Sequence, residues 1–198
     1  MVLQNLPKMF YSYDEGWPEV VRLHPSVARI FLSYVMPMSL IPAAMVVYSM
    51  FVTPGAVFPE MEPNITGFEA AALFLTFYVA QLLMVPLMAS IIQQMGDVVK
   101  ARPDHHSAFM LAAIAPTPLW ICALVLFIPS VWVAGIALAV AWVASAALIY
   151  HGVEPLFGLD SHSESRLMGS FVLTAGVVAW CALLTLLALA LSMIVGLR

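Results

Sequence analysis

Charged residues are scarce in this sequence. Only 9% of its 198 residues are Asp, Glu, Lys or Arg, whereas 63% are hydrophobic and the mean hydropathy is +1.00. A soluble domain usually carries about 25% charged residues, so the composition indicates an integral membrane protein. The net charge of -4 comes from few side chains and forms no basic patch, which argues against a nucleic-acid partner.

Cysteine and catalytic motifs are also scarce. Cys122 and Cys181 each lie in the middle of an apolar run, where cysteine acts as a small hydrophobic side chain, so neither a disulfide nor a metal framework is supported. The chain has no G-x-S-x-G, H-E-x-x-H, P-loop or G-x-G-x-x-G motif. We therefore expect a protein that is not an enzyme and uses no cofactor.

The N-terminal segment, residues 1–26, lacks the apolar core of a signal peptide. The first membrane span is therefore expected to target the chain. Tyr11, Tyr13 and Trp17 are mixed here with charged residues, which favours a cytoplasmic segment lying in the membrane interface with its rings at headgroup depth. A partly ordered tail is the alternative.

Long apolar runs are what the sequence has in abundance. A membrane span needs roughly 20 predominantly apolar residues, and five segments meet that requirement: Val27–Val52, Phe68–Met95, Ser107–Ile128, Val131–Tyr150 and Leu167–Leu197. The sequence thus predicts an all-α bundle of five transmembrane helices over residues 27–198. Pro129 and Ser130 alone separate the third and fourth spans, which predicts a tight antiparallel hairpin.

Two helix starts carry a local signal. Thr66 to Glu69 and Ser161 to Glu164 both fit the S/T-x-x-E capping box. They predict that the second helix begins near Gly67 and the fifth near His162.

The orientation follows from the basic residues, which favour the cytoplasmic side. Six of the seven lie before or at the start of the first span, or in or beside the second and fourth connections: Lys8, Arg22, Arg29, Lys100, Arg102 and Arg166. The seventh is Arg198 at the C-terminus. We therefore expect a cytoplasmic N-terminus and a C-terminus outside.

Prolines occur in the first three spans, at Pro37, Pro42, Pro86, Pro116 and Pro118. Each removes a backbone donor, so these helices are expected to be kinked or locally unwound. Proline is frequent in transmembrane helices and shapes bundles, which is our main interpretation. The alternative is a solute site formed at broken helices.

Polar side chains within the spans are neutral. No Asp, Glu or His lies deep in a span, which disfavours a proton-coupled pump. The candidates for a cavity or helix-break site are Tyr34, Tyr78, Gln81, Pro116, Thr117 and Pro118. We interpret Gln81 as a link between helices, with solute binding as the alternative. Ala137, Ala141 and Ser145 form a small-xxx-small face for close helix packing.

Histidines cluster in two connections that the charge pattern places on one side. The residues available to a metal ion are His105, His106, His151, His162 and Glu164. Helical metal sites usually present ligands three or four residues apart, whereas His105 and His106 are adjacent. His151 and Glu154 have the right spacing, but Pro155 is expected to end that helix. We interpret these residues as markers of the water boundary, and metal binding is the alternative.

Three stretches carry a family resemblance: Leu23-His24-Pro25-Ser26, the run FYVAQLLMVPLMASIIQQMG, and APTPLW followed by a hairpin and YHGVEPLFGLD. The chain resembles the Yip family of Ypt/Rab-interacting membrane proteins, in particular its bacterial inner-membrane YohC-like branch. The resemblance implies five spans with a cytosolic N-terminus. Eukaryotic relatives act in vesicle traffic with prenylated GTPases, but the N-terminal region here is shorter than theirs. The family offers no catalytic residue to carry over.

The leading hypothesis is a non-enzymatic, multi-pass protein of the bacterial inner membrane that organises the bilayer or partner proteins, as a homo-oligomer or with another membrane protein. One alternative is a transporter or channel for a small solute, metal ion or lipid, with its site between helices one to three. A second alternative is an accessory subunit of a larger membrane complex.

Overall fold

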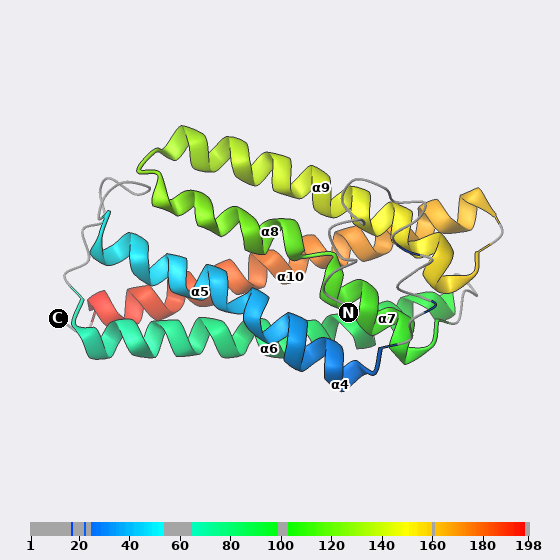
Figure 1. Ribbon diagram of the computed structural model, residues 1–198, viewed down its shortest axis with the longest axis horizontal. Coiled ribbons are helices and arrows are strands. Elements are labelled where there is room, and N and C mark those ends of the chain that lie inside the picture. Colours follow the sequence, from blue (N-terminus) through cyan, green and yellow to red (C-terminus); the bar gives the residue numbers. More distant parts are fainter. Residues whose placement is uncertain are drawn as a thin grey trace.

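The computed structural model describes residues 17, 22, 25–53, 65–98, 103–159 and 161–196, with side chains through residue 193. Within these residues, five helical segments are long and apolar enough to cross a membrane, as the sequence predicts. Their bounds are Val27–Phe51, Gly67–Val98, His105–Phe127, Val131–Phe157 and His162–Met193. Figure 1 shows them as an elongated helical bundle.

Two of the five spans are divided into shorter elements. The first comprises α4 (Val27–Ile30), the π-helical η1 (Phe31–Val35) and α5 (Met36–Phe51). The third comprises α7 (His105–Ile114), α8 (Thr117–Cys122) and the 3-10 helical η2 (Ala123–Phe127). The second, fourth and fifth are the continuous helices α6 (Gly67–Val98), α9 (Val131–Phe157) and α10 (His162–Gly196).

Side-chain caps fix where α6 and α10 begin. In α6 the Glu69 carboxylate accepts from the Thr66 N–H at 2.7 Å, and Thr66 Oγ1 accepts from the Glu69 N–H at 3.4 Å. In α10 the Glu164 N–H donates to Ser161 Oγ at 3.3 Å. Both predicted helix starts are confirmed, at Gly67 and His162.

The third and fourth spans form the predicted hairpin. Ser130 caps α9, its hydroxyl accepting from the Val133 N–H at 3.5 Å. Helix α8 and η2 then pack against α9, and the two arms lie side by side in Figure 1. The end of the bundle that holds Pro129 and Ser130 is called the hairpin end below, and the end at which α7 begins is called the α7 end.

The expectation that Pro155 ends the fourth helix is wrong. Helix α9 continues through it to Phe157 and is closed by Gly158, which has a φ of 62°. A proline removes its own N–H bond to the carbonyl one turn back, and its ring crowds that carbonyl. The helical bonds beyond it nevertheless continue, and the Gly158 N–H donates to the Glu154 carbonyl at 3.0 Å. Glycine adopts the left-handed conformation at such a terminus without steric cost.

Burial is uneven among the helices. Helix α7 is central, with every residue from Ala108 to Ile114 buried, and it contacts both α6 and α9. Helix α10 packs against α6 and α9, but only 6% of its most apolar stretch is buried inside the bundle, against 50% for the third span. Figure 1 shows α9 and α10 together at the α7 end and widely separated at the hairpin end.

Trp17 belongs to the core at the α7 end. Its side chain is completely buried, so the expectation of rings at headgroup depth does not hold for this residue. The indole lies so close to Gly152 of α9 that a Cβ there would come within 2.5 Å of Trp17 Cζ2. The indole of Trp17 can therefore pack here only because residue 152 is a glycine and has no side chain.

Candidate functional site

The third span breaks between α7 and α8, at Ala115 and Pro116. Because Pro118 has no N–H, the Ile114 carbonyl lacks the donor that a regular helix would supply four residues later. The Thr117 hydroxyl replaces it, donating to Ile114 O at 2.6 Å. At the break the Ile114 carbonyl thus keeps a hydrogen-bond donor, because a side-chain hydroxyl replaces the missing backbone N–H.

The same hydroxyl joins this break to the first span. Thr117 Oγ1 forms a short hydrogen bond with the Tyr34 hydroxyl, and both side chains are buried. Since the single Thr117 proton is directed to Ile114 O, Tyr34 is the donor. Tyr34 lies in η1, where the Met36 N–H bonds to Phe31 O, five residues back, just before Pro37. Two proline-interrupted segments therefore meet through one buried bond.

Tyr78 and Gln81 attach α6 to α5. The Tyr78 hydroxyl donates to the Met36 carbonyl at 3.1 Å. The Gln81 amide donates to the carbonyls of Ser39 at 3.3 Å and Phe77 at 3.4 Å, and the side chain is buried. Both residues thus bond to backbone atoms of the first span.

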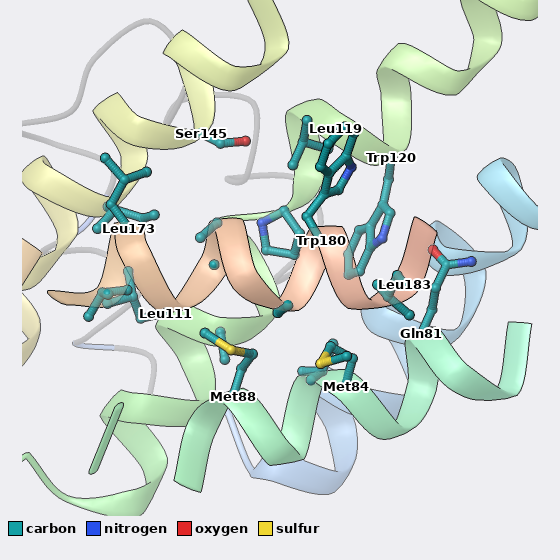
Figure 2. Close-up of a pocket in the computed structure, with 18 of the residues that line it drawn as sticks. Gln81, Met84, Met88, Leu111, Leu119, Trp120, Ser145, Leu173, Trp180 and Leu183 are labelled. Atoms are coloured by element: carbon teal, nitrogen blue, oxygen red, sulfur yellow. The ribbon is translucent and has the colours of Figure 1, made fainter. Parts of the chain in front are cut away.

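A cavity of about 160 Å³ adjoins this region, among α5, α6, α7, α8, α9 and α10. Most of its wall is apolar, and Gln81 and Ser145 contribute polar side chains, as Figure 2 shows. The other lining residues include Met84, Met88, Leu111, Pro116, Leu119, Trp120, Trp142, Leu173, Gly176, Trp180 and Leu183. Of the sequence candidates, Gln81, Pro116 and Ser145 line this cavity, whereas Tyr34, Tyr78 and Thr117 do not.

The tryptophans of this cavity, Trp120, Trp142 and Trp180, were not among the residues predicted from the sequence. The rings of Trp142 and Trp180 make an edge-to-face contact between α9 and α10, with centroids 5.3 Å apart and planes at 85°. Trp120 joins them on the wall. The position of two of them in the sequence could have indicated a special role. Membrane tryptophans are usually enriched at the two interfaces, whereas Trp142 and Trp180 lie in the middle of their spans.

Comparison with known families shows to which family the chain belongs. A family model described as the Yip1 domain matches residues 8–184. The chain belongs to the Yip1 domain family. No curated protein and no solved structure gave a significant match.

The features that suggested the family lie at structurally important points of this Yip1 domain. Thr117 and Pro118 form the satisfied helix break. Gly152, in the stretch before Pro155, receives Trp17. The matched residues also include the whole cavity wall.

The Asp104-His105-His106 cluster divides into separate roles at the start of α7. Asp104 caps the helix by accepting from the Ser107 N–H at 3.2 Å. His106 Nε2 donates to the Pro25 carbonyl at 2.7 Å, joining this end to the first span. The His105 ring contacts Phe109, with centroids 6.3 Å apart. These roles accord with a polar boundary.

The remaining histidines lie at the ends of α9 and α10. His151 Nδ1 donates to Ala147 O at 2.8 Å, and exposed His162 and Glu164 occupy the first turn of α10. Among the described residues, no three His, Cys, Asp or Glu side chains gather where they could hold a metal ion.

Removing the Asp104 cap is expected to lower the free energy of unfolding. Asp104→Ala should cost about 0.5–2 kcal/mol, as for other lost N-caps. Burial acts to raise the pKa of Asp104, but hydrogen bonds from Ser107 and the positive charge of His106 hold it below its ordinary value. The carboxylate therefore stabilises the fold above its unfolded pKa of about 4, and this contribution is lost as the pH falls through the lower, folded pKa.

Thermal unfolding of detergent-solubilised protein at several pH values checks this prediction. Asp104→Asn is the matched control, because asparagine caps well but does not titrate. It should keep most of the stability at neutral pH and lose less than the parent protein on acidification. Equal acid sensitivity of the two proteins would contradict the assignment.

The predicted small-residue face of α9 turns inward over most of its length. Ala141 and Ser145 are buried and Ala137 is half-buried. In this Yip1 domain the face thus packs within the chain's own bundle.

Proposed function

We propose that this Yip1-domain protein is a non-enzymatic membrane organiser that acts through helix association, with α10 as the contact helix and a second copy of the chain as its partner. The observation that carries the proposal is a row of exposed, mostly small residues along one side of α10, the least buried span. Thr174, Val178, Cys181, Thr185, Ala188 and Ser192 are spaced alternately by four and three residues, and all are exposed. They are called the α10 stripe below.

Small residues at a membrane helix surface favour association because they let two backbones approach closely. Alternating spacings of four and three keep such residues on one seam between two helices. The hydroxyls of Thr174 and Thr185 donate to carbonyls of their own helix, both at 2.8 Å, so their methyl groups remain for packing. A stripe that faces its own copy about a twofold axis gives a closed dimer.

The polar side chains of the first three spans support an organising role over transport. Tyr34, Tyr78, Gln81 and Thr117 all bond to other helices or to their own backbone. None of these four bonds needs a solute to complete it. The predicted orientation, with the N-terminus inside, would place the bundle's histidines on the cytoplasmic side.

Oxidative cross-linking in native membranes tests the proposal. Cys122→Ser leaves Cys181, an exposed member of the α10 stripe, as the reacting thiol. We expect a disulfide-linked dimer to form efficiently on mild oxidation. Adding Ala188→Trp should prevent it, because a bulky ring on the seam keeps the two backbones apart.

The matched control moves the thiol off the α10 stripe. Cys122→Ser with Cys181→Ser and Leu186→Cys places it at another exposed position, about 140° around the same helix at roughly 100° per residue. This protein should cross-link several-fold less. Equal cross-linking at the two positions would mean random collision in the bilayer and would overturn the proposed contact.

A further inference from the structure

The cavity is suited to an apolar molecule rather than to water. A buried water usually needs two to four polar partners, whereas an apolar cavity of about 150 Å³ stays dry and binds a benzene-sized ring. The cavity here has a similar volume, about 160 Å³, although it is partly open at the surface of the bundle, and aliphatic side chains and the rings of Trp120, Trp142 and Trp180 form much of its wall. Its dimensions and chemistry thus match a single small ring.

Ser145 places a polar hydroxyl in the cavity wall, and a purely apolar guest could not form a hydrogen bond with it. The hydroxyls of Ser39, Ser90, Thr174 and Thr185 each donate to a carbonyl one turn back in their own helix. The Ser145 hydroxyl is fully buried and has no hydrogen-bond partner among the described residues, although the side chain is 3% exposed and lines the cavity. Figure 2 shows its oxygen pointing toward the side of Leu119 and Trp120.

An unmade hydrogen bond in such a place is costly, because the buried hydroxyl has given up its hydrogen bonds to water and gained none in return. A guest that offers an acceptor to the Ser145 proton recovers that free energy, whereas a hydrocarbon chain does not. A carbonyl oxygen on a ring meets both requirements of the cavity.

The cavity has a route for a tail. It is partly open at the surface of the bundle, and the side chain of Leu184, on its α10 wall, is 40% exposed. A ring held at Trp142 and Trp180 can therefore carry an apolar tail out past α10 into lipid.

We propose that this cavity binds a membrane-dissolved molecule with a quinone-type ring, in which Ser145 donates a hydrogen bond to a ring carbonyl and the tryptophans surround the ring. The site is independent of the α10 stripe, so it stands or falls separately from the proposed dimer.

Fluorescence quenching by a decyl-substituted benzoquinone tests the proposal in reconstituted vesicles. The protein used carries Trp132→Phe, because Trp132 is 83% exposed and would report quinone that is merely dissolved in lipid. We expect saturable quenching. Ser145→Ala should weaken the apparent affinity about threefold to tenfold, as for the loss of one neutral hydrogen bond.

Gly176→Leu is a second variant that blocks the cavity. Gly176 lines it, and a Cβ at this position would meet no atom within 4 Å, so the larger side chain enters open space and should abolish saturable quenching. Gly135→Leu, where a Cβ is equally unobstructed but outside the cavity, should leave binding unchanged. Decylbenzene, which lacks the carbonyl, should compete at least threefold more weakly than the quinone.

Two results would overturn the assignment. Quenching that rises linearly with quinone, to the same extent in the parent protein and in Gly176→Leu, would show that the quinone only partitions into lipid. Equal competition by decylbenzene, with no effect of Ser145→Ala, would show a site for apolar chains without carbonyl recognition.

Discussion

Gly152→Ala is expected to lower the free energy of unfolding by about 1–3 kcal/mol, the usual cost of adding a methyl group to a filled core. The added Cβ would lie 2.5 Å from Trp17 Cζ2 and 2.8 Å from Trp17 Cε2. These atoms belong to a rigid, fully buried indole, so the ring as a whole must move. The loss is measurable by denaturant or thermal unfolding of the protein in detergent.

Gly135→Ala is the matched control in the same helix. A Cβ at Gly135 meets nothing within 4 Å, and replacing glycine by alanine within a helix gains about 0.5–1 kcal/mol. The two substitutions should therefore have opposite signs, although their effects on helix propensity are the same.

A double-mutant cycle attributes the clash to Trp17. Trp17→Ala alone should be destabilising by about 3–5 kcal/mol, since it empties a core position. In that background Gly152→Ala should become neutral or stabilising, because the ring it would strike is gone. An undiminished penalty for Gly152→Ala in the absence of Trp17 would refute the contact.

The spans were predictable because they depend on local sequence. Run length defines a membrane helix, and the capping boxes at Thr66 and Ser161 act within one turn, so α6 and α10 begin where expected. The place of Trp17 was not predictable in the same way. An aromatic residue near a span is compatible with both the interface and the core, and the contact with Gly152 depends on how distant parts of the chain fold together.

The candidate site was predictable only in part, for a related reason. Pro116-Thr117-Pro118 marks a helix break by its chemistry alone, and the break is where the sequence suggests. Which helix faces it is a different question. When a helix is apolar on all sides, hydrophobic periodicity gives little information about the direction of its faces. The pairing of Tyr34 with Thr117 and the gathering of Ser145 with Trp142 and Trp180 therefore required the structure.

Thr117→Val is expected to lower the free energy of unfolding by about 2–4 kcal/mol, because it removes two buried bonds at nearly constant side-chain volume. The interhelical bond from Tyr34 contributes about 0.6–1.7 kcal/mol by analogy with other membrane proteins. The Ile114 carbonyl, which Pro118 has already deprived of its helical donor, loses its Thr117 partner, and an unsatisfied buried group costs about 1–3 kcal/mol. Unfolding in detergent measures the sum.

Two further substitutions separate the two terms. Tyr34→Phe removes only the interhelical donor, so alone it should cost about 0.6–1.7 kcal/mol, and it should add almost nothing to Thr117→Val. Pro118→Ala supplies an N–H four residues after Ile114, so it should recover part of the stability lost in Thr117→Val. Thr117→Ser, which keeps the hydroxyl, should remain close to the parent protein. If Thr117→Ser were as destabilising as Thr117→Val, the lost methyl group rather than the hydroxyl would be holding the break, and the hydrogen-bonded junction of the first and third spans would be disproved.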